Sequence, residues 1–150
     1  MNWKTEAVER LKKYEGCCHA IHNIPLEIKR LELEARSPAR ASLEQTAGKA
    51  TGRREDKLLN NIVFRQTLRW SLEQTRQWLD ATNDALQCLE PEERLILQRL
   101  YIYQEKDGLE RLCRELGVER SSVYRYRDRA LEKFTVALFG KSDNFPKMAG

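Results

Sequence analysis

Four arginines lie close together near the carboxy-terminal end of the chain, and their chemistry suits a negatively charged polymer. They are Arg120, Arg125, Arg127 and Arg129, and Asp128 is the one acid between positions 120 and 129. Four positive charges less one give this window +3, although the whole chain carries only +4. Guanidinium groups form paired hydrogen bonds with guanine edges and with phosphates. We therefore expect contact with duplex DNA, and the simpler alternative is an arginine-rich face that is only solvated.

The same window has the periodicity of a helix with one buried face. Its apolar residues recur at helical spacing and are Val123, Tyr126, Ala130, Leu131 and Phe134. The face expected to be exposed carries Arg120, Ser121, Ser122, Tyr124, Arg125, Arg127 and Arg129. Two of these, Arg120 and Arg125, are the expected base readers, and Ser121, Ser122 and Tyr124 would assist them. The expected phosphate contacts are Arg127, Arg129 and Lys133.

A tight turn and a shorter helix are predicted directly before this basic helix. Leu109, Leu112 and Leu116 repeat at three and four residues, and Gly117 follows where the chain must turn. Glycine can adopt the left-handed conformation that ends a helix, and Val118 can fill the gap between two helices. Two helices joined in this way, the second of them basic, are typical of a helix-turn-helix that reads the major groove.

A bracing helix is expected over residues 92–103. Pro91 suits the first turn of a helix, and the carboxylates of Glu92 and Glu93 favour its positive end. Its expected core residues are Leu95, Ile96, Leu97, Leu100 and Tyr101. A loop at residues 106–108 leads to the next helix. The sequence thus predicts a DNA-binding domain at 89–139, after which Gly140 begins a flexible tail, 140–150.

This region resembles region four of the bacterial RNA polymerase sigma factors. The resemblance rests on Leu89-x-Pro91-Glu92-Glu93-Arg94, Leu97, Leu100-Tyr101, Leu112, Leu116-Gly117-Val118, Arg120, Val123 and Ala130-Leu131-x-Lys133-Phe134. With two long helices ahead of it, the chain is most similar to phage late-transcription regulators of the ArpU and RinA type. It resembles them closely over 89–134 and upstream only in architecture.

The resemblance implies base readers at Arg120, Ser121, Ser122, Tyr124 and Arg125. It also implies activation of phage or prophage late genes in the bacterial host cell, with RNA polymerase as a candidate second partner. Two of the reading positions are serine, and Glu119 stands where sigma factors usually have a serine or threonine cap. A promoter −35 element is therefore not assumed as the target.

The chain as a whole is expected to be all-α. Charged residues make up 33% of it, and seven glycines and four prolines are too few for a turn-rich β fold. Residues 3–36 are expected to be helical, with one apolar stripe along an otherwise charged surface. Pro25 is expected to kink the helix or to make it restart, and Asn23 is the candidate cap of a restarted helix. The stripe consists of Trp3, Ala7, Leu11, Tyr14, Cys18, Ile21, Ile28, Leu31 and Ala35. Residues 37–54 lose the stripe and are expected to be a mobile linker, or else a basic arm that grasps phosphates.

A second long helix is expected over residues 55–89. Its seam alternates steps of three and four through Leu58, Asn61, Arg65, Leu68, Leu72, Thr75, Leu79, Thr82, Leu86 and Leu89, as in a coiled coil. With the first helix it would form a long antiparallel hairpin within residues 1–88. Ile62, Phe64, Trp70 and Trp78 lie off this seam, and a second apolar surface predicts a homo-oligomer, with a dimer favoured. The alternative is that the carboxy-terminal helices fold back over that surface.

Other classes of function receive little support. The four cysteines show no C-x-x-C spacing, and Cys88 and Cys113 are expected to be small core residues. Cys18 and His22 lie one turn apart, but the four ligands crowded there cannot converge on one ion, so we expect no metal and no cofactor. No catalytic motif is present, so we do not expect an enzyme. Neither a membrane span nor a signal segment is predicted, so the expected location is cytoplasmic.

Two alternatives to a transcription regulator remain open. A ring-forming DNA-recognition (small) subunit of a phage packaging terminase would also join a helix-turn-helix to oligomerising helices. A polymerase-binding adaptor would use the sigma-like segment for docking and would not contact DNA.

Overall fold

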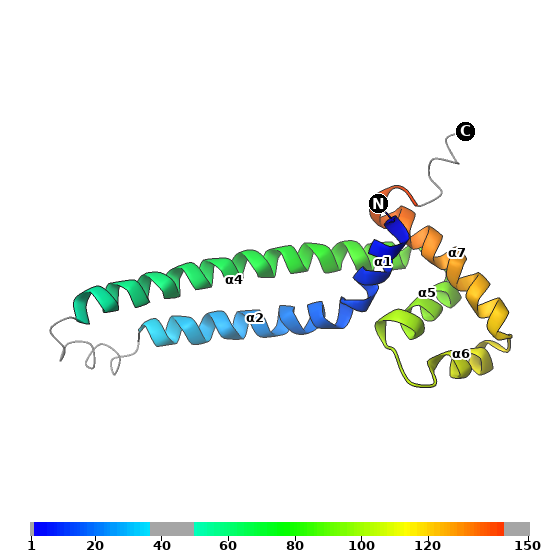
Figure 1. Ribbon diagram of the computed structural model, residues 1–150, viewed down its shortest axis with the longest axis horizontal. Coiled ribbons are helices and arrows are strands. Elements are labelled where there is room, and N and C mark those ends of the chain that lie inside the picture. Colours follow the sequence, from blue (N-terminus) through cyan, green and yellow to red (C-terminus); the bar gives the residue numbers. More distant parts are fainter. Residues whose placement is uncertain (1, 37–49, 143–150) are drawn as a thin grey trace. The chain divides into compact units, whose positions relative to one another are not determined.

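The protein is helical in every element that its computed structural model describes, namely residues 2–36 and 50–142, and these ranges contain no strand (Figure 1). The elements are α1 (Trp3–Lys12), α2 (Tyr14–Ala35), α4 (Ala50–Gln87), α5 (Pro91–Leu97), a π-helical turn η1 (Gln98–Ile102), α6 (Gly108–Leu116) and α7 (Arg120–Phe139). The expected all-α class is confirmed. Most of the expected linker and the end of the expected tail lie outside the described residues.

The described residues divide into two compact units. We call residues 18–36 and 50–77 the hairpin, and residues 2–17 and 78–142 the core module. This division differs from the one expected from the sequence, because α1 packs against α7 and η1. Ala7 and Leu11 of α1 are fully buried in one cluster with Leu97 and Phe134. The apolar stripe of residues 3–36 therefore serves two units, its first part in the core module and its later part in the hairpin.

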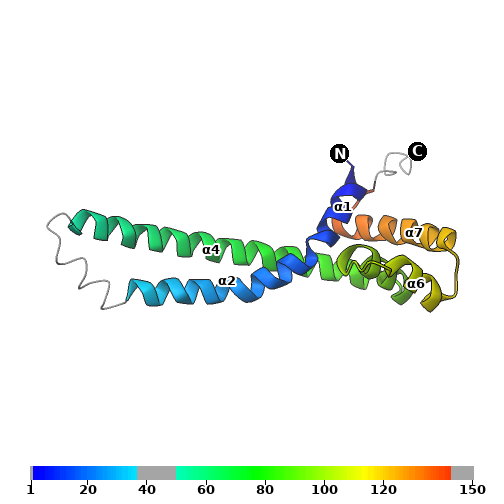
Figure 2. The same ribbon diagram turned by 60° about the horizontal axis from the view of Figure 1, so that its bottom comes forward.

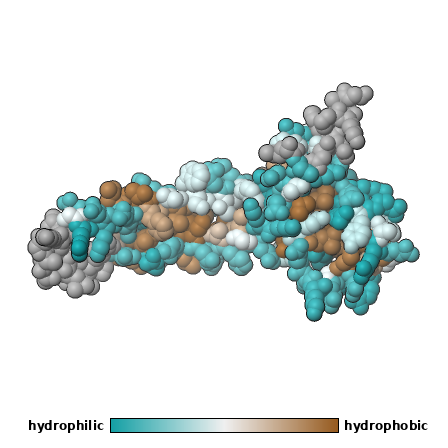
Figure 3. Space-filling view, in the orientation of Figure 1, coloured by the Kyte–Doolittle hydropathy of each residue, from teal (hydrophilic) through white to brown (hydrophobic). Residues whose placement is uncertain are grey.

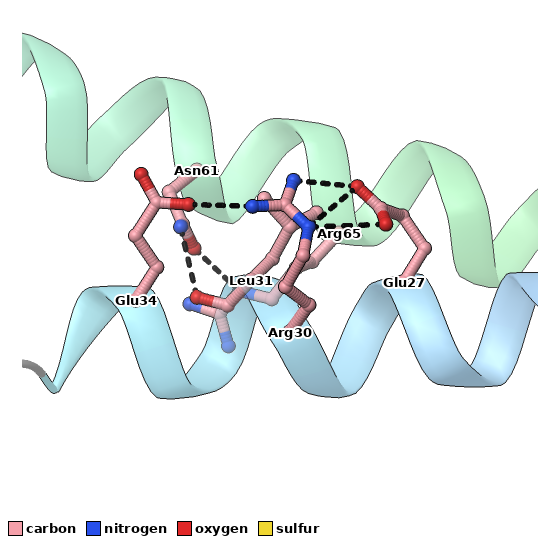
Figure 4. A network of polar contacts seen from close by, with 6 residues as sticks. All are labelled: Glu27, Arg30, Leu31, Glu34, Asn61 and Arg65. Carbon is pink, nitrogen blue, oxygen red and sulfur yellow. Dashed lines mark hydrogen bonds and ion pairs between the residues drawn. The ribbon is translucent and has the colours of Figure 1, made fainter.

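In the hairpin, α2 and α4 run side by side in opposite directions, in both views (Figures 1 and 2). Ile28, Leu31 and Asn61 are buried between them. The side-chain amide of Asn61 donates to the backbone carbonyl of Leu31 at 3.0 Å, and Arg65 Nε donates to Asn61 Oδ1 at 2.8 Å (Figure 4). A buried amide needs both a donor and an acceptor, and these two bonds supply them. Asn61, one of the polar positions of the seam, therefore packs against α2, as the periodicity predicts.

Of the kink or restart expected at Pro25, the restart does not occur. α2 passes through Pro25 without interruption, and Asn23 lies within the helix and caps nothing. The break between helices occurs instead at Lys13, between α1 and α2. Pro25 is exposed, so water can satisfy the carbonyl that loses its helical partner at a proline.

Several finer predictions also need correction. α4 begins at Ala50, so the expected linker ends earlier than residue 54. Leu58 is 45% exposed and does not join the buried seam. Cys18 and Cys88 are exposed, which removes Cys88 from the core, whereas Cys113 is half-buried against a core cluster. These apolar or small residues lie at the edges of their helical faces, where sequence periodicity does not decide burial.

The start of α5 shows why the chain turns there. Glu90 caps the helix, Pro91 occupies its first turn, and Glu93 Oε1 accepts the backbone N–H of Glu90 at 3.0 Å, which forms a capping box. The guanidinium of Arg94 donates to the carbonyls of Leu86 and Leu89, both at 3.1 Å. The end of α4 is thereby tied to the first turn of α5.

The predicted end of the last helix is confirmed. Gly140 follows α7 with φ of +73°, in the left-handed conformation that glycine adopts readily. The first residues of the expected tail are ordered beyond it. Ser142 is buried and donates to Glu132 at 2.8 Å, and the ammonium of Lys141 lies 4.5 Å from the ring centroid of Trp3.

Candidate nucleic-acid interface

A three-residue turn joins α6 to α7, as the sequence predicts. Gly117 has φ of +65°, and the backbone N–H of Val118 donates to the carbonyl of Cys113 at 3.1 Å. Glu119 is extended and α7 begins at Arg120. A side chain at position 117 would be strained in this left-handed conformation. Gly117 therefore fixes the direction in which α7 leaves α6.

The buried side of α7 is anchored in two clusters. Val123 packs with Ile96 and Leu112, and half-buried Val118 lies against the same cluster. Further along the helix, Ala130 and Phe134 are fully buried in the cluster that contains α1. The expected buried face is confirmed, with Leu131 also buried and Tyr126 half-buried. Because α7 is held at both ends of one face, its opposite face has a fixed orientation toward solvent.

That exposed face presents a row of polar side chains at steps of four. Ser121, Arg125 and Arg129 are all exposed, and a helix places residues i, i+4 and i+8 along one side. Tyr124 is exposed beside the row, whereas Ser122 is half-buried at its edge and accepts a hydrogen bond of 3.4 Å from Arg125. The structure thus brings together most of the base readers expected from the sequence.

Arg127 and Lys133 do not belong to this row. Arg127 lies four residues after the buried Val123, so its side chain is only 29% exposed and is directed to the side of η1. It donates to Asp128 at 2.9 Å and stacks 4.9 Å from the ring centroid of Tyr124. Lys133 pairs with Glu93 of α5 at 2.9 Å. Both residues therefore already have a partner within the chain.

The environment of Arg127 also affects Tyr101 of η1. Burial raises the pKa of Tyr101, and the nearby Arg127 guanidinium only partly opposes this. Burial acts to lower the pKa of Arg127, but its hydrogen bond with Asp128 and its proximity to Tyr101 outweigh that effect and raise it. The two side chains therefore form an internal polar contact region between η1 and α7.

Arg125 and Arg129 differ from the other basic residues of α7. Among the residues that the structure describes, neither has a carboxylate within ion-pair distance. Each guanidinium lies 5.8 Å from the ring centroid of Tyr126, one on either side in sequence. Arg120, in contrast, is paired with Glu110 of α6 at 3.0 Å, although both side chains are more than half exposed. The positive charge of the row therefore rests on Arg125 and Arg129.

Three neighbours of the row were missed by reasoning from the sequence. Glu110 reaches Arg120 across the turn, Tyr126 adjoins both open arginines, and exposed Arg114 lines a shallow depression with Cys113, Glu119 and the Glu110–Arg120 pair. The spacing of Glu110 and Arg120 carries no signal unless the direction of α7 is known. Tyr126 does have the helical spacing of a core residue, and this concealed its second role.

Other kinds of site are not supported by the described residues. Within them, no three His, Cys, Asp or Glu side chains are grouped so that they could hold a metal ion. None of the helices in these ranges is both long enough and apolar enough to span a bilayer. Three comparisons with known proteins, against family models, curated sequences and solved structures, give no match to this chain.

Proposed function

We propose that this protein is a sequence-specific transcription regulator that binds double-stranded DNA through the exposed face of α7. The observation that carries the proposal is the pair Arg125 and Arg129. They lie one turn apart on a helix whose other face is buried at both ends, and no acid in the described ranges pairs with either of them. By its resemblance to sigma region four and to ArpU and RinA regulators, the proposal extends to activation of phage late genes, with RNA polymerase as a candidate partner.

In this proposal α6, the turn and α7 act as a helix-turn-helix, and α7 enters the major groove. Arg125 is the principal base reader, because a guanidinium can bond O6 and N7 of one guanine and such a pair contributes about 1–3 kcal/mol of discrimination. Its bond with Ser122 is long, so the side chain can exchange that partner for a base at little cost. Ser121 and Tyr124 lie beside it and can contact adjacent bases or phosphates.

Arg129 lies one turn further from the start of α7 and is proposed to contact phosphate. A base at the floor of the groove is reached by the first turns of a recognition helix, and later turns meet the backbone. Arg114 on α6 is exposed and is a second candidate for phosphate. Arg127 is assigned a different role, in which its contacts with Asp128 and Tyr124 hold the side of α7 next to η1.

Arg120 is proposed to be a base reader that α6 orients. Its pair with Glu110 engages one terminal nitrogen, which leaves other donors of the guanidinium for a base. Because both side chains are exposed, the pair contributes little in water. Close to DNA it would restrict the arginine to one direction.

The proposal is tested by measuring the affinity of the purified chain for duplexes of random sequence as a function of salt. Affinity should fall steeply with salt, because each neutralised phosphate adds about −0.9 to the slope of log K against log salt. Arg129→Ala should reduce that slope by about one. The matched control is Arg30→Ala in the hairpin, which removes an arginine bonded to Glu27 and Glu34 and should leave the slope unchanged. Absence of binding at low salt, or an equal effect of both substitutions, would overturn the proposal.

A further inference from the structure

A strip of exposed apolar side chains runs along α4 within the hairpin. Leu59 is 58% exposed, Val63 50% and Trp70 66%, and exposed Gln66 lies between the last two. These positions follow steps of four, three and four, which is the spacing of a coiled-coil seam. The next positions at this spacing are the exposed polar residues Glu73 and Gln77, so the apolar strip ends at Trp70. Brown hydrophobic residues are open to solvent on the hairpin surface in Figure 3.

The strip is distinct from the seam that packs on α2. Asn61 and Leu68 belong to that inner seam, and they are two residues after Leu59 and two before Trp70. Two residues correspond to about 200° around a helix, so the strip lies on the opposite side of α4. α2 cannot cover it. A contiguous exposed apolar strip of this kind marks an interaction surface.

The strip from Leu59 to Trp70 contains no charged side chain. The charged residues between these two positions lie off the strip and are Arg65, bonded to Asn61 at 2.8 Å, and Arg69, paired with Glu32 of α2 at 2.8 Å. Both arginines are thus engaged on the α2 side of the helix. A neutral strip has little to offer to nucleic acid or to a charged peptide, whereas it can face an identical strip without repulsion.

The outer face of α2 provides a contrast. Leu26 and Leu33 are 57% and 61% exposed and lie seven residues apart, so they share one side of the helix. Between them Arg30 bonds Glu27 at 2.6 Å and Glu34 at 3.1 Å. These two leucines are therefore separated by a charged network that is already satisfied (Figure 4). On α4, by contrast, the residue between Val63 and Trp70 at this spacing is the uncharged Gln66.

We propose that the α4 strip binds the same strip of a second copy of this chain, as a two-helix coiled coil. In a symmetric dimer the same surface patch of both copies forms the interface, so a strip without charged side chains can face its own copy without repulsion. The coiled-coil spacing calls for a long helical partner, and α4 itself is a helix of 38 residues. Gln66 at the centre of the strip supplies a polar position that can fix the register of the pair.

Trp70 lies at one end of the strip and is its largest side chain. A tryptophan side chain buries roughly 150–250 Å² when it is covered, which makes it the largest single contact on the strip. The inference does not depend on DNA binding. A dimer does contain two copies of α7, which is the number that a regulator of two half-sites needs.

The test is the mass of the full chain in solution, measured by analytical ultracentrifugation over a range of concentrations. The wild type should form a dimer. Trp70→Glu and, separately, Val63→Glu should each weaken dimerisation by roughly a hundredfold or more, because two like charges would face each other across the interface. Both positions are at least half exposed, so the helical circular dichroism should be unchanged.

The matched control is Leu33→Glu, which adds the same charge at a similarly exposed position on α2 and should leave the dimer intact. A wild type that is monomeric at every concentration would overturn the proposal. So would an assembly that survives both α4 substitutions, or one that Leu33→Glu dissociates equally well. A monomeric wild type that still binds DNA would reject the dimer and leave the proposed function standing.

Discussion

Three arginines of the hairpin and two arginines of α7 are used in opposite ways. In the hairpin Arg30, Arg65 and Arg69 each bond an acid or a buried amide of the same unit. On the exposed face of α7, Arg125 and Arg129 have no such partner among the described residues, and aromatic contacts with Tyr126 leave their charge in place. The number of arginines in a region therefore does not identify a binding surface. A binding surface is identified by charged side chains without an ion-pair partner, on a helix whose opposite face is buried.

The largest effect is expected from removing the anchor of α7. Phe134 of α7 is fully buried in the cluster that also contains residues of α1. Phe134→Ala should therefore lower the free energy of unfolding by about 3–5 kcal/mol. Chemical denaturation followed by circular dichroism measures this change. If the free energy of unfolding falls by less than about 1 kcal/mol, burial of Phe134 does not anchor α7.

The open arginines should separate into two roles. Arg125→Ala should cost about 1–3 kcal/mol at the specific DNA site and much less on random DNA, whereas Arg129→Ala should weaken binding to all sequences and flatten the salt dependence. Titrations of both variants against a specific and a random duplex measure the difference. Equal losses on the two duplexes for both variants would remove the division of roles.

A polar residue of the hairpin should affect stability alone. Asn61→Ala removes a buried hydrogen bond to Leu31 and leaves Arg65 without its amide partner, so unfolding should become easier by about 1–2 kcal/mol. DNA affinity should not change. The neighbouring Asn60 is exposed, and Asn60→Ala is the control that should have no effect on stability. If the Asn61 variant is fully folded and still binds DNA more weakly than the wild type, the hairpin and α7 do not have separate roles.

Arg127 lies on α7, but its side chain contacts Asp128 and Tyr124 of the same helix and so resembles the arginines of the hairpin. Loss of its stacking on Tyr124 should destabilise the protein by about 0.5–1 kcal/mol in Arg127→Ala. The salt dependence of DNA binding by the Arg127→Ala variant should be the same as that of the wild type. If the slope instead falls as it does for Arg129→Ala, then Arg127 reaches phosphate and its contact with Asp128 is not maintained on DNA.

The smallest effect is expected at Arg30. Its pKa is raised by the hydrogen bond and charge of Glu27, but the whole network is exposed on the surface of α2. Such exposed pairs contribute little, so Arg30→Ala should unfold within experimental error of the wild type. A clear drop in thermal stability would show that surface pairing in the hairpin matters more than this account allows.

Local rules were sufficient to predict much of the α7 region from the sequence. Gly117 and Gly140 are left-handed, and Val123 and Phe134 are buried, because each of these outcomes depends on residue type and helical spacing. Arg127 could have been assigned to the inner side by the same spacing. It was grouped instead with the other arginines by charge.

Other features depend on contacts between distant segments. Ala7 and Leu11 have the same pattern whether they pack in a hairpin or, as observed, against α7 and η1. Lys133 pairs with Glu93, which is 40 residues away, whereas Arg129 one turn earlier pairs with no acid in the part of the chain that the structure describes. Which cations remain open is therefore decided by tertiary packing, and periodicity and composition do not contain that information.

Selection of random-sequence duplexes by the full chain at near-physiological salt tests the central claim most directly, because non-specific phosphate binding is suppressed there. The account predicts that the wild type enriches a motif and that Arg125→Ala loses a defined base pair of it, whereas Arg30→Ala enriches the wild-type motif. If folded wild-type protein enriches no sequence, the open arginines of α7 do not read DNA and the central claim is contradicted.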